Sequence, residues 1–353
     1  MIPNKNLFKG SKTLPVDKFF DRVLFDKKNG YYSSKFPFGK TGDFVTSPGI
    51  SNLFSEMIGI WLISSWHTLG QPKKFNIVEL GPGDGSLSKV LVKTFQKFPK
   101  FNDAVKIFLY EKSNFLIKLQ KKKINSSKVK WIKKISKINK GPVIFFGNEF
   151  FDAIPIKQFL RKKNSYYEKN YLIKKDKIHQ VYKKASVKDI SQINKFKVIK
   201  KLRFIEFPKL GFNELNKMIR KISELNGGLL LIDYGYSNSI HKSTLQSVIR
   251  HKKNKLLNNL GEADVTSLVN FKLLKEYFIK NDLKVKKIVT QKYFLEKMGI
   301  LNRANNLSKN MNFKEQSSLY LRLKRLLDIK LMGNLFKVIF AFKYKKENFL
   351  GFE

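Results

Sequence analysis

The sequence predicts an α/β fold, in which a parallel sheet with crossover helices carries a helical addition in front and an inserted α+β subdomain. Two observations support this fold class. From residue 76 onward the pattern runs strand, glycine loop, helix, strand, which is typical of a parallel sheet. After the fourth strand, short segments separated by turn residues interrupt this alternation, until the continuous apolar run 228–233 resumes the buried sheet.

Five parts are expected along the chain. They are a helical addition at 1–75, the first half of the sheet domain at 76–155, the inserted subdomain at 156–227, the second half of the sheet domain at 228–343 and a tail at 344–353. The apolar positions of 50–69 follow helical spacing. Glu56 and His67 interrupt this stretch, so it predicts a buried helix rather than a membrane span.

The sheet domain is expected to alternate strands and helices. Strands are predicted at 75–80, 104–110, 129–132, 142–146, 228–233, 285–289 and 336–342, and helices at 86–98 and 113–123. Inside the insertion, strands are predicted at 156–161, 166–173 and 178–182, followed by a helix at 212–225. Turn residues separate these three strands, so the insertion begins as a meander.

The chain is strongly basic. Lysine and arginine together number 71 against 27 aspartates and glutamates, which gives a net charge of +44. Only 8 of the basic residues are arginine, the residue that grips phosphate with two parallel hydrogen bonds, and the lysines are spread through the sequence. A lysine bias at solvated positions therefore explains the charge better than a specific nucleic-acid site, which stays as an alternative.

Composition also excludes several kinds of site. The sequence has no cysteine, which excludes disulfides, thiolate metal sites and a cysteine nucleophile. The four histidines show no spacing of metal ligands, so no metal site is expected; they are His67, His179, His241 and His251.

The first 17 residues bear on the compartment. They lack the apolar core of an export signal and the arginine-rich amphipathic pattern of a mitochondrial presequence. This predicts a bacterial cytoplasm, with a mitochondrial matrix as the second choice.

The segment 79–87, E-L-G-P-G-D-G-S-L, joins a predicted strand to a predicted helix. Its three glycines, spaced two residues apart, allow positive φ and close approach of the backbone to a ligand. A dinucleotide fingerprint needs glycine at position 86, where this chain has Ser86, so NAD is disfavoured. The spacing instead resembles the S-adenosylmethionine loop of Rossmann-like class I methyltransferases, in which Glu79 would face the ligand's ammonium group. An ordinary tight turn is the alternative.

A second carboxylate ends the next predicted strand. Glu111 follows I-F-L-Y, where a carboxylate can accept both hydroxyls of a ribose. A surface glutamate at a strand end is the alternative. Because Glu79 and Glu111 follow adjacent parallel strands, the pair indicates a nucleoside ligand.

The fourth strand ends in 147–155, G-N-E-F-F-D-A-I-P. In class I methyltransferases that act on nitrogen, the corresponding loop lies beside the methyl donor and carries polar residues that orient the acceptor. Asn148, Glu149 and Asp152 are the candidates for this role. Alternatively, Asn148 caps a following helix.

Further segments make the resemblance more specific. They are G-K-T-G-D-F-V-T-S-P-G-I-S at 39–51, N-E-F-F-D-A-I-P at 148–155, I-D-Y-G-Y at 232–236, L-G-E-A-D-V-T at 260–266, Q-K-Y-F-L at 291–295 and M-G-N-L-F-K-V at 332–338. In this order the chain resembles the MidA family of methyltransferases, which includes a mitochondrial complex I assembly factor that methylates arginine.

The resemblance implies a class I methyltransferase fold, S-adenosyl-L-methionine as cofactor, and a protein substrate presenting an arginine, by analogy a subunit of respiratory complex I. It also implies an amino-terminal loop that closes over the cofactor, and a glycine loop with two glutamates that hold it. The residues are Gly42, Asp43, Thr46, Ser47 and Pro48 in the closing loop, and Glu79, Gly81, Gly83 and Glu111 in the cradle. Two positions depart from the family pattern: Gly49 replaces a glutamate and Asp84 replaces an arginine.

An arginine acceptor has a pKa above about 12 and is hard to deprotonate. Carboxylates that bind two guanidinium nitrogens can draw the positive charge away from the third, which can then attack. We hypothesise that Glu149, Asp152 and Asp264 do this. An RNA or small-molecule methyltransferase, or a non-catalytic assembly chaperone that keeps the cofactor pocket, are the alternatives.

Overall fold

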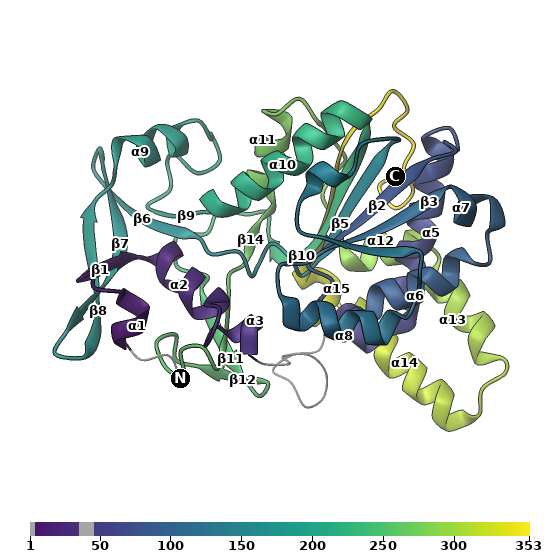
Figure 1. Ribbon diagram of the computed structural model, residues 1–353, viewed down its shortest axis with the longest axis horizontal. Helices are drawn as coiled ribbons and strands as arrows, with labels where there is room; N and C mark the ends of the chain where they lie inside the picture. The colour runs from purple at the N-terminus through teal and green to yellow at the C-terminus, as the bar shows by residue number, and fades with distance from the viewer. Residues whose placement is uncertain (1–3, 35–45) are drawn as a thin grey trace. The chain divides into compact units, whose positions relative to one another are not determined.

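The computed structural model describes residues 4–34 and 46–353, and contacts divide the chain into two compact units (Figure 1). The sheet unit consists of Val45–Phe150, Lys217–Gly235 and Phe278–Glu353. The insert unit consists of Met1–Phe44, Phe151–Asn216 and Tyr236–Tyr277. This division differs from the predicted boundaries, because the start of the chain and the stretch 236–277 share a unit with the predicted insertion.

The sheet unit is built on a mainly parallel sheet with the strand order β15, β17, β10, β5, β2, β3, β4. Its strands are β2 Phe75–Leu80, β3 Val105–Tyr110, β4 Val129–Ile132, β5 Val143–Asn148, β10 Gly227–Tyr236, β15 Lys284–Val285, β16 Val289–Thr290 and β17 Phe336–Lys343. The strands from β4 to β10 pair in parallel, and β17 pairs antiparallel with β10. All six residues of β2 are buried, as expected for a central strand. The predicted α/β fold class is confirmed.

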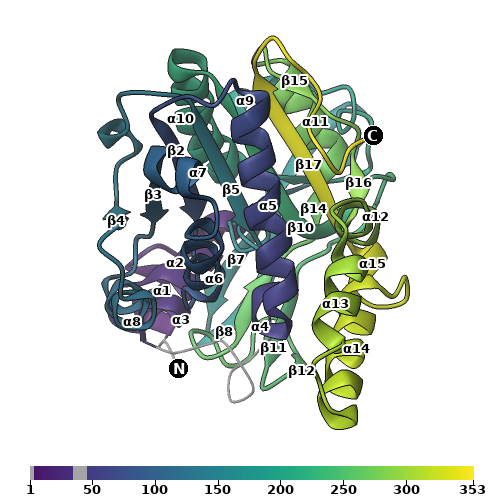
Figure 2. The ribbon, with the colours of Figure 1, turned by 90° about the vertical axis from the view of Figure 1, so that its right-hand side faces the viewer.

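The predicted helix at 50–69 is α5, Asn52–Thr68. It begins at Ser51, whose Oγ accepts the N–H of Leu53. Figure 2 shows α5 running along the sheet in front of β10 and β17. Its Trp61 ring packs edge-on against Phe340 of β17 with centroids 4.9 Å apart. No helix among the described residues is long and apolar enough to span a bilayer.

The sheet unit contains further helices. They are α4 Ser47–Ile50, α6 Ser86–Phe95, α7 Pro99–Ala104, α8 Asn114–Ile124, the 3-10 turn Ile135–Lys137, α12 Gln291–Lys297, α13 Ile300–Ser308, α14 Phe313–Leu327 and α15 Met332–Leu335. The helices predicted at 86–98 and 113–123 correspond to α6 and α8.

The single strand predicted at 285–289 is wrong. The structure places two short strands there, β15 and β16, and both pair antiparallel with β17. Lys286 and Lys287 lie between them, one half-buried and one exposed. Because an ammonium group is costly to bury without a partner, these lysines interrupt the buried run that the apolar flanks predict.

The insert unit contains an antiparallel sheet with the order β1, β7, β6, β9, in which β8 also pairs with β7. Its strands are β1 Thr13–Pro15, β6 Lys157–Lys162, β7 Ser165–Lys174, β8 Lys177–Lys184 and β9 Phe204–Phe207, and a smaller sheet holds β11 Gln246–Ile249, β12 Lys252–Asn254 and β13 Asp264–Thr266. The predicted meander is confirmed. Lys175 and Asp176 both have positive φ, 48° and 54°, as a two-residue hairpin turn requires.

The insert unit also contains helices α1 Asn4–Phe8, α2 Val16–Phe25, α3 Tyr31–Ser34 and α9 Val187–Asn194. The chain crosses between the units in α10 Lys209–Leu225 and α11 Phe271–Ile279, and β14 covers Val269–Asn270. Helix α2 packs on the antiparallel sheet, where the rings of Phe19 and Tyr171 lie 4.5 Å apart. Strand β9 and helix α9 were not predicted.

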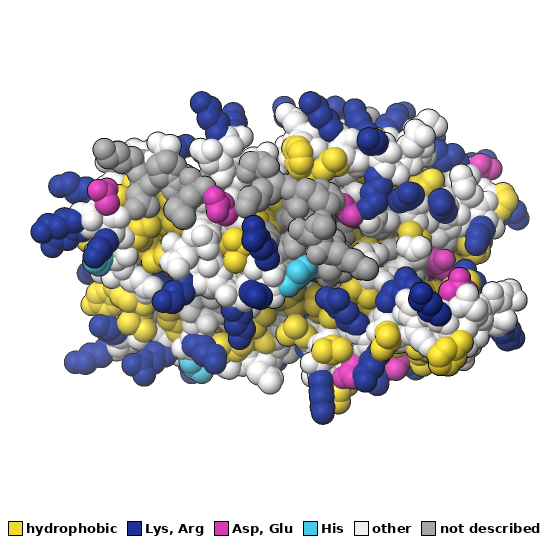
Figure 3. Space-filling model, turned by 90° about the horizontal axis from the view of Figure 1, so that it is seen from below, with side chains coloured by type: hydrophobic (Ala, Val, Ile, Leu, Met, Phe, Trp, Pro, Cys, Tyr) yellow, Lys and Arg dark blue, Asp and Glu magenta, His cyan; other side chains and the backbone are white. Residues whose placement is uncertain are grey.

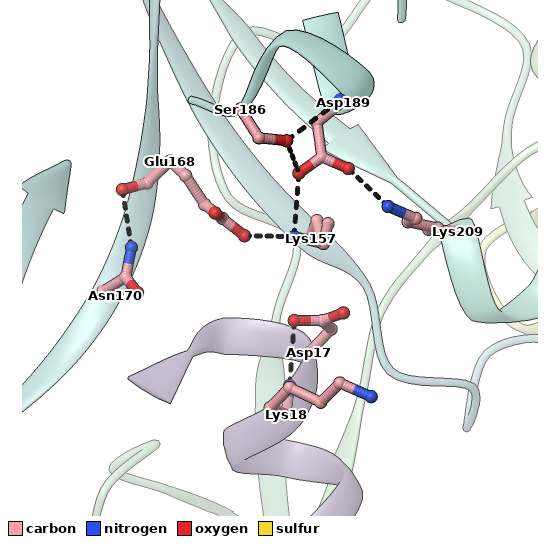
Figure 4. Close-up of polar contacts among 8 residues, drawn as sticks. All are labelled: Asp17, Lys18, Lys157, Glu168, Asn170, Ser186, Asp189 and Lys209. Carbon is pink, nitrogen blue, oxygen red and sulfur yellow. Dashed lines mark hydrogen bonds and ion pairs between the residues drawn. The ribbon is translucent and has the colours of Figure 1, made fainter. Parts of the chain in front are cut away.

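A buried ion network, which we call the Lys157 network, ties this sheet to α9 (Figure 4). The Nζ of Lys157 lies 2.5 Å from Glu168 Oε1 and 3.1 Å from Asp189 Oδ2. Lys209 Nζ lies 2.7 Å from the other Asp189 oxygen, and Ser186 Oγ donates to Asp189 at 2.9 Å. Each buried charge therefore has an opposite charge within hydrogen-bonding distance.

The basic residues are dispersed. Figure 3 shows lysine and arginine side chains scattered over the visible face rather than gathered into one patch. This distribution agrees with a lysine bias at solvated positions.

Candidate functional site

The predicted glycine loop connects β2 to α6 in the sheet unit. Gly81, Gly83 and Gly85 all have positive φ, at 57°, 54° and 79°. The N–H of Gly81 donates to the carbonyl of Tyr110 at 3.1 Å, which fixes the loop against β3. A side chain at position 81 would place its Cβ 3.0 Å from the Phe150 ring. The loop therefore depends on bare backbone, as the sequence predicts.

Glu79, near the end of β2, is only 3% exposed. Its carboxyl accepts a hydrogen bond from Ser88 Oγ of α6. Burial raises the pKa of Glu79 to about 8, and the nearby acids Asp84 and Glu111 act in the same direction. No described lysine or arginine forms an ion pair with this carboxyl group. A cationic ligand group would therefore meet a buried acid that can ionise to receive it.

Glu111 lies at the same edge of the sheet, because β2 and β3 pair in parallel with Leu80 opposite Tyr110. It is 8% exposed, so the alternative of an ordinary surface glutamate is wrong. Its Oε1 accepts the N–H of Ser113 at 2.8 Å, and its Oε2 accepts from Gln120 Nε2 at 3.2 Å. Burial raises its pKa, and these two hydrogen bonds oppose the shift.

Gln120 is a site residue that the sequence analysis missed. Its side chain is fully buried, and Nε2 also donates to the carbonyl of Gly83 at 2.8 Å while Oε1 accepts from Trp131 Nε1 at 2.9 Å. It thus links the glycine loop to Glu111. A signal was available, since Leu116, Gln120 and Ile124 form the buried stripe of α8 at a spacing of four, and a polar residue in such a stripe is unusual.

Asp84, which departs from the family pattern, is bound within the loop. Its Oδ1 accepts the N–H of Ser86 at 2.9 Å, and its Oδ2 pairs with Lys123 Nζ of α8. The aspartate therefore ties the loop to the first residue of α6, whose N-cap residue is Gly85, and Lys123 places a cation close to the loop.

The predicted acceptor-side pair lies at the carboxyl end of β5. Glu149 has φ 52°, and its N–H donates to the carbonyl of Ile232 at 2.9 Å. Its Oε1 accepts from Asn148 Nδ2 at 3.1 Å and from the N–H of Ser47 at 3.2 Å. Asn148 Oδ1 is buried without a hydrogen-bond partner among the described residues. The alternative that Asn148 caps a helix is wrong, because no helix follows it before β6.

The predicted closing loop is described only in part. Gly42 and Asp43 lie outside the described residues. Thr46 precedes α4 as its N-cap residue, and Ser47 is fully buried with its Oγ 3.4 Å from Gln291 Oε1. Pro48 is half-buried and Gly49 is exposed.

Asp152 and Asp264 belong to the insert unit, whereas Asn148 and Glu149 belong to the sheet unit. Both aspartates are 5% exposed. Asp264 Oδ1 accepts from the hydroxyl of Tyr32 at 3.2 Å. Burial, followed by the charges of Asp264 and Asp152, raises the pKa of Tyr32 well above its usual value. Within this unit the two acids therefore act on one tyrosine, which the sequence analysis did not single out.

The described residues contain no group of three or more histidine, aspartate or glutamate side chains placed to hold a metal ion.

Comparisons with known proteins identify the family and the fold. A family model of S-adenosyl-L-methionine-dependent methyltransferases matches residues 57–289. A Xenopus laevis protein named protein arginine methyltransferase NDUFAF7, mitochondrial, is 28% identical over 345 residues, covering 88% of this chain and 76% of that protein. The Caenorhabditis elegans homolog is 30% identical over 299 residues, covering 76% and 68%.

A solved structure shares the fold. It is a COG1565 superfamily member and likely methyl transferase from Burkholderia thailandensis, bound to S-adenosyl-homocysteine. The two structures align with a TM-score of 0.81 at 19% identity, and the alignment covers 99% of this chain and 90% of that one. Because the sequence identity is only 19%, this similarity supports the fold of the chain and nothing more specific.

The predicted bacterial cytoplasm is wrong. Relatives from Xenopus laevis, Drosophila melanogaster and Danio rerio are all named mitochondrial proteins, which points to mitochondria instead. The prediction rested only on the pattern of the first 17 residues.

Proposed function

Because the chain belongs to the MidA family of S-adenosyl-L-methionine-dependent methyltransferases, we propose that it methylates an arginine side chain of a protein substrate. The enzyme class and the cofactor follow from the family, and the acceptor is the proposal. The names of the relatives support a protein arginine. The family resemblance further suggests a subunit of respiratory complex I as the substrate.

The cradle residues fit the cofactor. The bare glycine loop leaves the backbone at Gly81 and Gly83 open to close approach, and a side chain at 81 would meet Phe150. Glu79 would receive the ammonium group of the amino-acid portion, and Glu111 would accept the ribose hydroxyls. When bound, S-adenosyl-L-methionine supplies an electrophilic methyl group on sulfur.

The observation that carries the proposal is the pair Asn148 and Glu149. Asn148 Oδ1 is a buried acceptor that no described residue satisfies, and the Glu149 carboxylate lies next to it. A guanidinium offers N–H donors to both groups. Held in this way, one arginine nitrogen would be placed to accept a methyl group, and Glu149 would take the proton that this nitrogen loses. Alignment of this kind can contribute roughly 7–11 kcal/mol.

We further propose that Asp152 and Asp264 recognise the positive charge of the substrate. Two buried carboxylates that both act on Tyr32 form an acidic cluster in the insert unit. Because these residues and the Asn148–Glu149 pair belong to different units, each pair needs its own test. Asp264→Asn should raise KM for the acceptor and leave cofactor affinity unchanged.

The test is methyl transfer from isotopically labelled S-adenosyl-L-methionine to a mitochondrial protein extract, read by mass spectrometry. We expect label on arginine. Glu149→Gln should lower kcat roughly 100-fold or more while cofactor affinity stays normal. The control is Glu224→Gln, which changes a glutamate whose side chain is 58% exposed. Label on RNA, on a small molecule or on nothing, or full activity in Glu149→Gln, contradicts the proposal.

A further inference from the structure

Ser47 is held from two sides. It is fully buried at the start of α4. Its N–H donates to Glu149 Oε1 at 3.2 Å, and its Oγ donates to Gln291 Oε1 at 3.4 Å. One residue of the amino-terminal segment therefore connects the acceptor-side carboxylate to the first residue of α12.

The side-chain amide of Gln291 is oriented so that its oxygen, which accepts hydrogen bonds, faces Ser47. Its side chain is fully buried, and Nε2 donates to the carbonyl of Leu326 in the last turn of α14 at 3.0 Å. A primary amide has one donor end and one acceptor end, so this bond fixes which end faces Ser47. The other buried side chains of α12 are Phe294 and Leu295. A buried amide among them is costly unless both of its ends are satisfied, and here both are.

The Glu149 carboxylate needs such support. Its backbone has φ 52°, in the left-handed region that residues with a side chain seldom adopt. The hydrogen bonds that it accepts include one from the adjacent Asn148 and one from Ser47, which is distant in sequence. The bond from Ser47 therefore fixes the carboxylate relative to the rest of the sheet unit.

We propose that Gln291 is a positioning residue of the methyl-transfer site: it holds Ser47 in the place from which the Ser47 N–H fixes the Glu149 carboxylate. This inference rests on the proposed role of Glu149. It gives a function to the Q-K-Y-F-L segment. It also makes the junction of α12 and α14 part of the framework of the site, although both helices are far from the glycine loop in the sequence.

The experiment compares Gln291→Leu, which removes both amide bonds at similar size, with Gln316→Leu. Gln316 is a matched control, because its Nε2 also donates to backbone carbonyls, those of Ser308 and Met311, both at 3.0 Å. Hydrogen exchange of the peptide around Ser47 provides a measurement that needs neither substrate nor cofactor. Kinetics with the arginine acceptor measure kcat, and calorimetry measures the Kd for S-adenosyl-homocysteine.

We expect Gln291→Leu to lose exchange protection at Ser47 and to lower kcat about 10-fold or more, with the Kd for S-adenosyl-homocysteine within about 3-fold of wild type. Ser47→Ala, which removes only the hydroxyl, should lower kcat similarly, and the double variant should be no worse than Gln291→Leu. Gln316→Leu should leave kcat and protection unchanged.

Unchanged protection and kcat in Gln291→Leu, or equal losses in Gln316→Leu, would overturn the inference. If Gln291→Leu fails to fold, Ser47→Ala carries the test, since it removes the hydroxyl that donates to Gln291, and unchanged protection and kcat in Ser47→Ala would then overturn the inference. If wild type methylates no arginine, the proposed function fails, and the exchange measurement still decides whether Gln291 holds Ser47.

Discussion

The two units bury carboxylates in different ways. In the sheet unit, Glu79 and Glu111 have neutral donors as partners: Ser88, the Ser113 N–H and Gln120. In the insert unit, the carboxylates of the Lys157 network have ammonium partners. Burial raises the pKa of Glu79 to about 8. Burial would also raise the pKa of Asp189, but hydrogen bonds from Lys209 and Lys157 lower it below its usual value.

The contrast teaches which buried acids can receive a ligand. An acid paired with lysine already has an opposite charge beside it, so it has little to offer a cation. Neutral partners alone do not make a site, as Glu206 shows: three donors from Thr244 and Gln158 surround it. Glu79 has one donor among the described residues, and a bare loop lies beside it. A buried acid that has few hydrogen-bond donors and lies next to a loop of bare backbone, as Glu79 does, is the feature that marks the cofactor cradle.

The largest expected effect is on the Lys157 network. Lys157→Met leaves Glu168 and Asp189 buried with fewer opposite charges, and should lower the free energy of unfolding by about 3–5 kcal/mol. Lys284→Met, which breaks an exposed pair with Glu347, should leave the free energy of unfolding nearly unchanged. Urea denaturation followed by circular dichroism measures both. Equal losses would remove the distinction between the two kinds of acid.

A smaller effect is expected on ligand affinity. Glu111→Gln replaces a charged acceptor of the ribose hydroxyls, and hydrogen bonds to charged groups contribute about 1.5–3 kcal/mol, so affinity for S-adenosyl-homocysteine should fall roughly 10- to 150-fold. Glu206→Gln, which changes a half-buried glutamate of the insert unit, should leave affinity unchanged. Calorimetry compares the two, and a loss in Glu206→Gln as large as in Glu111→Gln would break the comparison.

A third signal is the pH dependence of Glu79. Its pKa is about 8 in the folded chain against 4.5 for an ordinary glutamate, so between these values the folded state holds a proton that the unfolded state has lost. Stability from this group is complete below about pH 4.5 and declines as pH rises toward 8. Glu79→Gln should flatten that decline in unfolding curves taken from pH 5 to 8. Asp189 has the opposite sign, because its lowered pKa gives stability that is lost at acid pH.

Much of the sheet unit was predictable from sequence. Apolar runs that end in glycine or an acid mark parallel strands, and the glycines of 81–85 adopt the positive φ that their spacing predicts. Glu79 and Glu111 were predictable as a pair because adjacent parallel strands end at one edge. These features could be predicted because they depend on residues that are neighbours along the chain, or on the rule that adjacent parallel strands end at the same edge of a sheet.

The residues that sequence analysis missed depend on contacts between distant segments. Gln120 reaches 37 residues back to Gly83, and Gln291 lies 244 residues from Ser47. Nothing local distinguishes such a glutamine from one exposed to water, apart from its position in a buried stripe. The sequence also gives no sign that Asp152 and Asp264 belong to a different unit from Glu149. Asp152 follows Glu149 by only three residues and yet lies in the other unit.

The most direct test of the cradle is calorimetric titration of the purified wild-type protein with S-adenosyl-L-methionine and, separately, with NAD. The bare glycine loop with the two buried acids Glu79 and Glu111 predicts binding of the first at one site per chain and none of the second. Binding of NAD, or no binding of S-adenosyl-L-methionine, would contradict the account.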